Sequence, residues 1–230
     1  MSQVLGHAQG NTMIEFDKDV SDDDDDAVEW FRKLGQFLTD HPEPKSYTSR
    51  QVDITHETLE SASIHDILDP VFQADCACET IEECDQNVAH LSAAQRRLYA
   101  VWWYEAEVNN GGHHQFYSNS YGMFWRDAVD GLEAIGAHSA KQILLDSVAR
   151  FAEPPSRDRA QRNDQLENLD FDDLNTRLYA NNEDLDALMR KFILAHAEDF
   201  LFSGILRYEN PSEFKLMYGR DGFRWERLTT

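Results

Sequence analysis

Residues 92–112 read SAAQRRLYAVWWYEAEVNNGG, and this stretch decides the fold. Ser92 can cap a helix, and the residues after it that recur at helical spacing are Leu98, Val101, Trp102, Glu105 and Val108. Asn and Gly tolerate the left-handed conformation common at helix C-termini, so residues 109–112 end this helix. We therefore predict a central helix over residues 92–110, with Leu98 and Trp102 buried, in a mainly α-helical fold.

Apolar spacing predicts further helices on both sides of the central one. The segments concerned are 28–38 (on a stripe of Val28, Phe31, Leu34 and Leu38), 57–68, 80–91, 124–135, 139–151, 171–179 and 183–200. The second is expected to end at Asp69-Pro70, and Ser139 is expected to cap the fifth. His196 is expected on the apolar face of the last helix, as a hydrogen-bonded core residue.

Short alternating segments predict a minor β component. Tyr47, Val52 and Ile54 suggest a short strand, and alternation around Asp221-Gly222 suggests a small hairpin near the C-terminus. The expected organisation is an acidic flexible arm (1–26), an acidic helical extension (27–86), a compact helical domain (87–203) and a C-terminal β element (204–230).

Acidic residues outnumber basic ones by 43 to 21, which gives the 230-residue chain a formal charge of −22. Residues 51–95 carry ten acids and no Lys or Arg, and residues 163–189 carry eight acids and one base. Direct charge-driven binding to nucleic acid or an anionic membrane is disfavoured, because such binding depends on Lys and Arg. A basic protein is the natural partner.

Neither a membrane span nor a signal peptide is indicated, because the chain has no run of eighteen apolar residues and no basic and then apolar N-terminal segment. We expect a cytoplasmic protein. The three cysteines, Cys76, Cys78 and Cys84, are an odd number and fit a reducing compartment, so we expect three free thiols.

The segment YEAEVNNGGHHQFYSNSYG (104–122), followed by AIGA (134–137), is the most specific motif of the chain. It resembles the bacterial DNA-mimic protein domain family, small acidic helical domains long described as domains of unknown function. In that family a Glu, an Asn-Gly-Gly turn, an aromatic stretch, an Asn-Ser-x-Gly and an Ile-Gly-Ala recur in this order. The resemblance covers residues 98–200, and it departs from the pattern at His113, where an aromatic residue is expected.

The resemblance implies a protein that presents carboxylates in place of DNA phosphates and so occupies a DNA-binding protein, such as a transcriptional regulator or nucleoid protein. Acidic side chains three or four apart on a helix lie about 5–6 Å from one another, close to the phosphate spacing of a strand. The residues expected to bind the partner are Asp53, Glu57, Glu60, Asp66, Glu79, Glu82, Glu83, Asp85, Asp170, Asp172 and Asp173. A homodimer is compatible with the sequence, although nothing in it demands one.

The motif itself is expected to be structural. Its members are Glu105, Asn109, Asn110, Gly111, Gly112, Phe116, Asn119 and Gly122. Glu105 shares the apolar stripe of its helix, so its carboxylate should accept backbone N–H bonds near the glycine turn. No catalytic residue, metal or cofactor is expected.

Three alternatives stay open on sequence alone. An immunity or antitoxin-like inhibitor of a basic nuclease would use the same electrostatics, and general surface acidity would suit a salt-adapted housekeeping protein. A metal-dependent hydrolase at Glu105, His113 and His114 is the least favoured, because adjacent residues on a helix point in different directions. A zinc site at the cysteines lacks a Cys-x2-Cys pair.

Overall fold

The chain forms two compact units in a computed structural model, which describes residues 14–16, 27–72, 80–211, 213–219 and 221–228. The larger unit spans Gln51–Leu206, and the smaller unit combines the chain up to Arg50 with the chain from Arg207 onward. Residues 51–86 therefore share a unit with the helical domain expected over 87–203. Their helices pack on those of that domain, which places them in one compact body.

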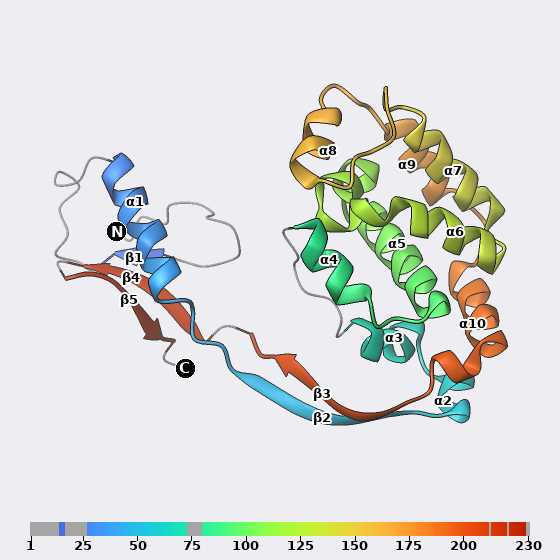
Figure 1. The fold of residues 1–230 in the computed structure, drawn as a ribbon, viewed down its shortest axis with the longest axis horizontal. Coiled ribbons are helices and arrows are strands. Elements are labelled where there is room, and N and C mark those ends of the chain that lie inside the picture. Colours follow the sequence, from blue (N-terminus) through green and yellow to red (C-terminus); the bar gives the residue numbers. More distant parts are fainter. Residues whose placement is uncertain (1–13, 17–26, 73–79, 212, 220, 229–230) are drawn as a thin grey trace. The chain divides into compact units, whose positions relative to one another are not determined.

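The larger unit is helical, as predicted (Figure 1). Its helices are α2 (His56–Ser61), α3 (Ile64–Phe72), α4 (Ile81–Val88), α5 (Ala93–Ser118), α6 (Trp125–Ile135), α7 (His138–Val148), α8 (Arg159–Gln165), α9 (Asp172–Tyr179) and α10 (Leu185–Ala195), with 3-10 turns η1 (Ser120–Phe124) and η2 (Ala197–Asp199). Strands β2 (Tyr47–Ile54) and β3 (Phe202–Glu209) pair with each other, and the division between the units falls within both.

Helix α5 is the centre of the larger unit, and α3, α6, α8, α9 and η1 all pack on it. Ser92 caps it in a capping box with Gln95, in which each side chain bonds the backbone N–H of the other residue. Leu98 is fully buried, as predicted. Trp102 is only partly buried, beside His65 and Phe72, because it lies toward the edge of the core.

The helix expected over 57–68 is two helices, α2 and α3, because Ser63 begins a new one. The Ser63 hydroxyl accepts the backbone N–H of Asp66 and donates to the Asp66 carboxylate. Helix α3 then continues through Pro70 to Phe72 instead of ending at Asp69. The cap of α7 also differs from expectation, since the Glu183 carboxylate, and not Ser139, accepts the first N–H groups of that helix.

The smaller unit contains helix α1 (Ala27–Asp40) and a three-stranded sheet, β1 (Ile14–Phe16), β4 (Phe214–Gly219) and β5 (Gly222–Arg227), in the order β1-β4-β5. The predicted hairpin is present as the antiparallel pair β4–β5. Residues 14–16 were expected in a loose arm, but they pair parallel with β4, which suits their apolar alternation.

Helix α1 meets the sheet through a different stripe from the one expected. The ring centroid of Trp30 lies 5.8 Å from that of Tyr218 and 5.3 Å from that of Phe223, and Leu34 is buried on the same side. Phe31 is 64% exposed, because the residue next to Trp30 on a helix is rotated by about 100° from it.

Cys84 lies in a disulfide, so the expectation of three free thiols is wrong for this residue. Cys76 and Cys78 lie outside the described residues, as does Glu79. In the ranges that the structure describes, every helix is too short or too polar to cross a membrane.

Candidate interaction surface and the motif beneath it

The glycine motif bends α5 at the predicted position without ending it. Gly111 and Gly112 leave helical geometry, with φ/ψ of −151°/24° and 75°/−178°, and helix resumes as far as Ser118. Gly112 needs to be glycine for two reasons. Its φ is positive, and a Cβ there would lie 2.5 Å from the side-chain nitrogen of Asn175. The second half of α5 is therefore aimed differently from the first.

A buried polar network holds this bend against α9. Asn175 Oδ1 accepts the backbone N–H of His113 at 3.0 Å and lies 2.7 Å from His113 Nδ1. Since this amide oxygen only accepts, Nδ1 carries the proton, and Nε2 accepts from the Tyr104 hydroxyl at 3.0 Å. Burial lowers the pKa of His113, which favours the neutral ring that this network needs.

Glu107, and not Glu105, accepts hydrogen bonds around the turn. Its carboxylate receives the side-chain amides of Gln115 at 2.7 Å and Asn119 at 2.9 Å. Gly111 makes room for this arrangement, because a Cβ there would lie 2.2 Å from Gln115 Oε1. The carboxylate beside the turn is therefore the one two residues after Glu105, on the other side of the helix, and it accepts side-chain amides rather than the backbone N–H groups expected.

Glu105 instead lies partly buried and accepts no hydrogen bond among the described residues. Burial, followed by the negative charges of Asp186 and Asp184, raises the pKa of its carboxyl to about 7. This carboxyl therefore takes up a proton at a higher pH than an ordinary glutamate does.

The remaining motif residues surround a buried arginine. The Arg162 side chain is fully buried and donates to the carbonyls of Tyr117, Asn119, Ser156 and Arg157, over 2.6–3.0 Å. Two of these carbonyls end α5, where a helix leaves its carbonyls without partners. A Cβ at Gly122 would lie 2.8 Å from Arg162 Nε, and Phe116 is buried beside the Tyr117 ring. Asn109 and Asn110 are exposed.

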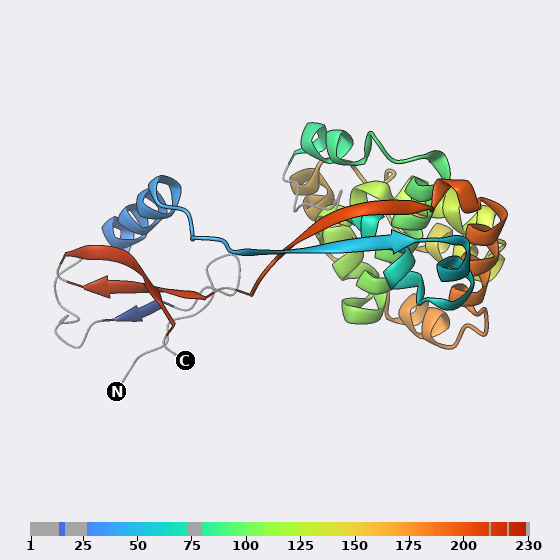
Figure 2. The ribbon, with the colours of Figure 1, turned by 90° about the horizontal axis from the view of Figure 1, so that it is seen from below.

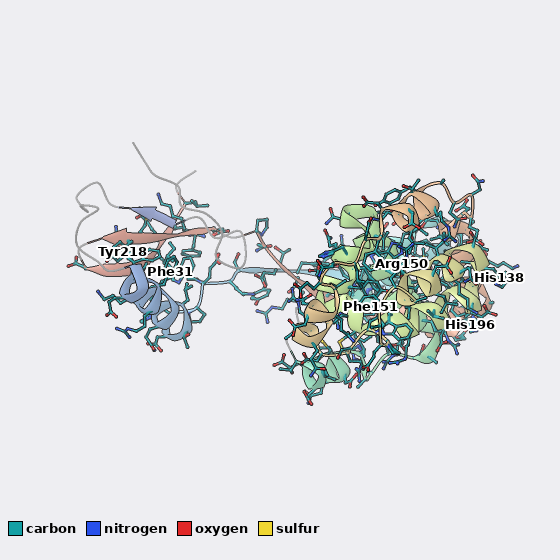
Figure 3. All side chains as sticks on the ribbon, turned by 90° about the horizontal axis from the view of Figure 1, so that it is seen from above. Phe31, His138, Arg150, Phe151, His196 and Tyr218 are labelled. Carbon is teal, nitrogen blue, oxygen red and sulfur yellow. The ribbon has the colours of Figure 1, made fainter. Side chains whose placement is uncertain are left out.

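The three residues of the metal-hydrolase alternative do not converge. His113 is buried with both ring nitrogens engaged, whereas His114 is exposed. Across the described ranges, no group of three His, Cys, Asp or Glu residues is arranged to hold a metal ion. His196 is exposed rather than part of the core (Figure 3). It is hydrogen-bonded as expected, since its Nδ1 donates to the carbonyl of Phe192 at 2.9 Å, and its ring stacks on the Phe192 ring.

The acidic residues expected to bind a partner do not form one continuous surface. Asp53, Glu57, Glu60 and Asp66 are exposed on β2, α2 and α3, at the lower end of the larger unit in Figure 1. Asp170, Asp172 and Asp173 are exposed at the start of α9, at the upper end. The structure brings together the members of each group, but it does not bring the two groups together.

Several of these carboxylates already have partners. Asp85 pairs with Arg157 at 2.5 Å, and Asp173 pairs with Arg150 at 2.7 Å. Glu83 completes the capping box of α4 with Thr80. Among the expected partner-binding residues, four have exposed side chains that make no ion pair or hydrogen bond within the described residues: Glu57, Glu60, Glu82 and Asp172. These carboxylates are the freest to meet another protein.

Most basic residues of the larger unit are used within it. The unit has 28 acidic and 11 basic residues, a formal charge of −17 out of −22. All eleven bases are described, and nine make internal contacts. Arg96, Lys141, Arg150, Arg157 and Arg177 pair with carboxylates; Arg159, Arg162 and Arg190 bond carbonyls; Arg126 stacks on Trp125. The surface charge of the unit is therefore dominated by its acids.

Residues 89–196 match the family model of DMP19-like proteins. This DMP19-like region begins just before the Ser92 cap and ends at the C-cap of α10, so it contains every residue of the glycine motif. The same comparisons return no curated protein and no solved structure that matches the chain.

The DMP19-like region carries only part of the negative charge. Its formal charge is −5, whereas residues 51–88, which precede it in the same unit, contribute −10 with no base. The exposed acids of α9 thus lie inside the region, and those of α2, α3 and α4 lie outside it.

Sequence reasoning missed three residues that organise the motif: Glu107, Arg162 and Asn175. Glu107 is part of the motif over 104–122, but the helical spacing favours Glu105, which shares the apolar stripe. Arg162 and Asn175 lie 40 or more residues from the glycine turn, in polar segments without a recognisable pattern. Only the packing of α8 and α9 on α5 brings them to it.

Proposed function

We propose that the larger unit binds the nucleic-acid-binding face of a basic DNA-binding protein, as a DNA mimic and without catalytic activity. The observation that carries this proposal is the match of residues 89–196 to the DMP19-like family within a unit of charge −17. A groove built to neutralise phosphates with Lys and Arg also accepts carboxylates.

The free carboxylates of α2 and α4, which lie at separate places on the larger unit, are the best candidates for contacts with the partner. Glu57, Glu60 and Glu82 are exposed and not neutralised by a base within the described ranges. The dense negative field of residues 51–88 should accelerate association with a basic partner, in a manner that salt screens. The acids at the start of α9 form a second, separate candidate contact inside the DMP19-like region.

The test is affinity capture from the native host at low and moderate salt, followed by competition of each captured protein with duplex DNA. We expect a DNA-binding protein that duplex DNA releases. The triple substitution Glu57→Gln, Glu60→Gln and Glu82→Gln should weaken its binding at least tenfold at low salt, with a shallower salt dependence.

Two matched variants show whether the position of the charge matters. Asp170→Asn with Asp172→Asn tests the α9 group, and Asp40→Asn with Glu43→Gln removes two charges from the smaller unit. We expect the latter pair to bind as the wild type does. If every variant loses affinity in proportion to charge alone, or if the captured proteins are indifferent to DNA, a specific mimic surface is refuted. Capture of a nuclease that the protein inhibits would favour the immunity-type alternative.

A further inference from the structure

A small cavity lies in the larger unit between α4, η1 and the start of α8. Its volume is about 20 Å³, which is room for one water-sized species. Its polar lining consists of Thr80, Ser120, Arg157, Asp158, Arg159 and Arg162. Three guanidinium groups around so small a space are unusual in a unit whose formal charge is −17.

Arg162 is the buried cation of this cavity that, among the described residues, has no carboxylate paired directly with it. It is fully buried, and all of its hydrogen bonds go to neutral carbonyl oxygens, so no carboxylate pairs directly with its charge. Nη2 uses one of its two N–H groups, on the carbonyl of Asn119, and the other finds no acceptor within the described residues. Buried charges are normally paired, because burial without a counter-charge is costly.

The charged residues that line the cavity, counted together with Asp85, leave one positive charge in excess. Arg157 pairs with Asp85, and Asp158, which caps α8, offsets one of the two remaining arginines. Arg159 is exposed and donates only Nε, to the carbonyl of Ser118, which leaves its Nη groups available within the described ranges. A single monovalent anion would balance this site in both charge and hydrogen bonding.

We propose that this cavity binds one small monovalent anion of the size of chloride, held by Arg162 and Arg159. The Thr80 hydroxyl, which also lines the cavity, can donate to the same ion. This site is independent of the proposed partner surface, because its ligand is an inorganic ion rather than a basic protein.

The test compares thermal unfolding of the full chain in sodium chloride, sodium bromide and sodium gluconate at one sodium concentration. Chloride and bromide should raise the melting temperature saturably, by about 3–6 °C at ten times the half-saturating concentration, and gluconate should not. Constant sodium separates binding from screening, which all three salts share.

Arg159→Gln should abolish the difference between chloride and gluconate. Its matched control is Arg97→Gln, since Arg97 is also exposed, on α5, and the change removes the same charge. Because Arg159 is at the surface, this variant is expected to fold even if Arg162→Met does not. Crystals soaked in bromide should give an anomalous peak beside Arg162 Nη2. The proposal is overturned if a water refines there without anomalous signal, if the three salts act alike, or if both variants behave alike.

Discussion

Replacing Asn175 by alanine should destabilise the larger unit by about 2–4 kcal/mol. The change removes the one oxygen that accepts both the backbone N–H and the Nδ1–H of His113. Each buried donor left unsatisfied costs about 1–3 kcal/mol, so the two donors together would cost about 2–6 kcal/mol. Asn175 is half-buried, so water can reach the site and should keep the loss in the lower part of that range. The measurement is urea unfolding followed by far-UV circular dichroism, which reports mainly the helices of this unit.

Two companion variants separate the hydrogen bonds from general effects of substitution. Asn175→Asp keeps an acceptor oxygen, so it should lose less stability than the alanine variant. Asn182→Ala removes an exposed amide near the end of α9, and it should change stability by less than about 0.5 kcal/mol. If Asn175→Ala unfolds at the same urea concentration as the wild type, the network does not hold the bend.

The same network predicts a pH dependence. The pKa of His113 is lower in the folded protein than in the unfolded chain, so the unfolded chain binds more protons below about pH 6.5. This contribution to stability is therefore present above pH 6.5 and is lost as the pH falls toward the folded pKa. His113→Phe should flatten the slope of stability against pH between 5 and 7, and an unchanged slope would contradict the neutral, buried state of the ring.

Three further predictions concern α5. Gly112→Ala should cost about 2–4 kcal/mol in urea unfolding, since φ is positive and the new Cβ would meet Asn175 at 2.5 Å; a neutral variant would contradict the bend. Leu98→Ala should cost about 2–5 kcal/mol and Trp102→Ala less, because only the first side chain is fully buried; the reverse order would refute the assigned core. Glu105→Gln should stabilise the protein at pH 8 and not at pH 4.5, because the folded pKa of about 7 penalises the charged form as the pH rises; an equal effect at both values would refute it.

The helices could be predicted from the sequence because their signals are local. Caps such as Ser92 and Gly136, and the apolar spacing between them, act within a few residues. The break between α2 and α3 was missed because Ser63 sits within a pattern that reads equally well as one helix. Strand β1 was missed because its partner, β4, lies about 200 residues away.

The site was less predictable, because it depends on which helices meet. Glu105 and Glu107 are about 200° apart around α5, so only the packing decides which one faces Gln115. Charge counting identified the acidic segments correctly but could not show that α2 and α9 lie at different ends of the unit. The number of charges in each segment can be read from the sequence, but which of them share a surface depends on how the helices pack.

In the larger unit, whose helices pack against one another (Figure 2), basic and acidic residues have different roles, and this difference decides which substitutions the fold tolerates. Arginines connect the helices of the larger unit through hydrogen bonds to carbonyls and ion pairs with carboxylates. Replacing one of these arginines should therefore destabilise the unit. Carboxylates such as Glu57, Glu60 and Glu82 make no ion pair or hydrogen bond within the described ranges. Substituting them should therefore change the free energy of unfolding little. The acidic pattern of this surface can therefore change by substitution while the packing of the helices stays the same.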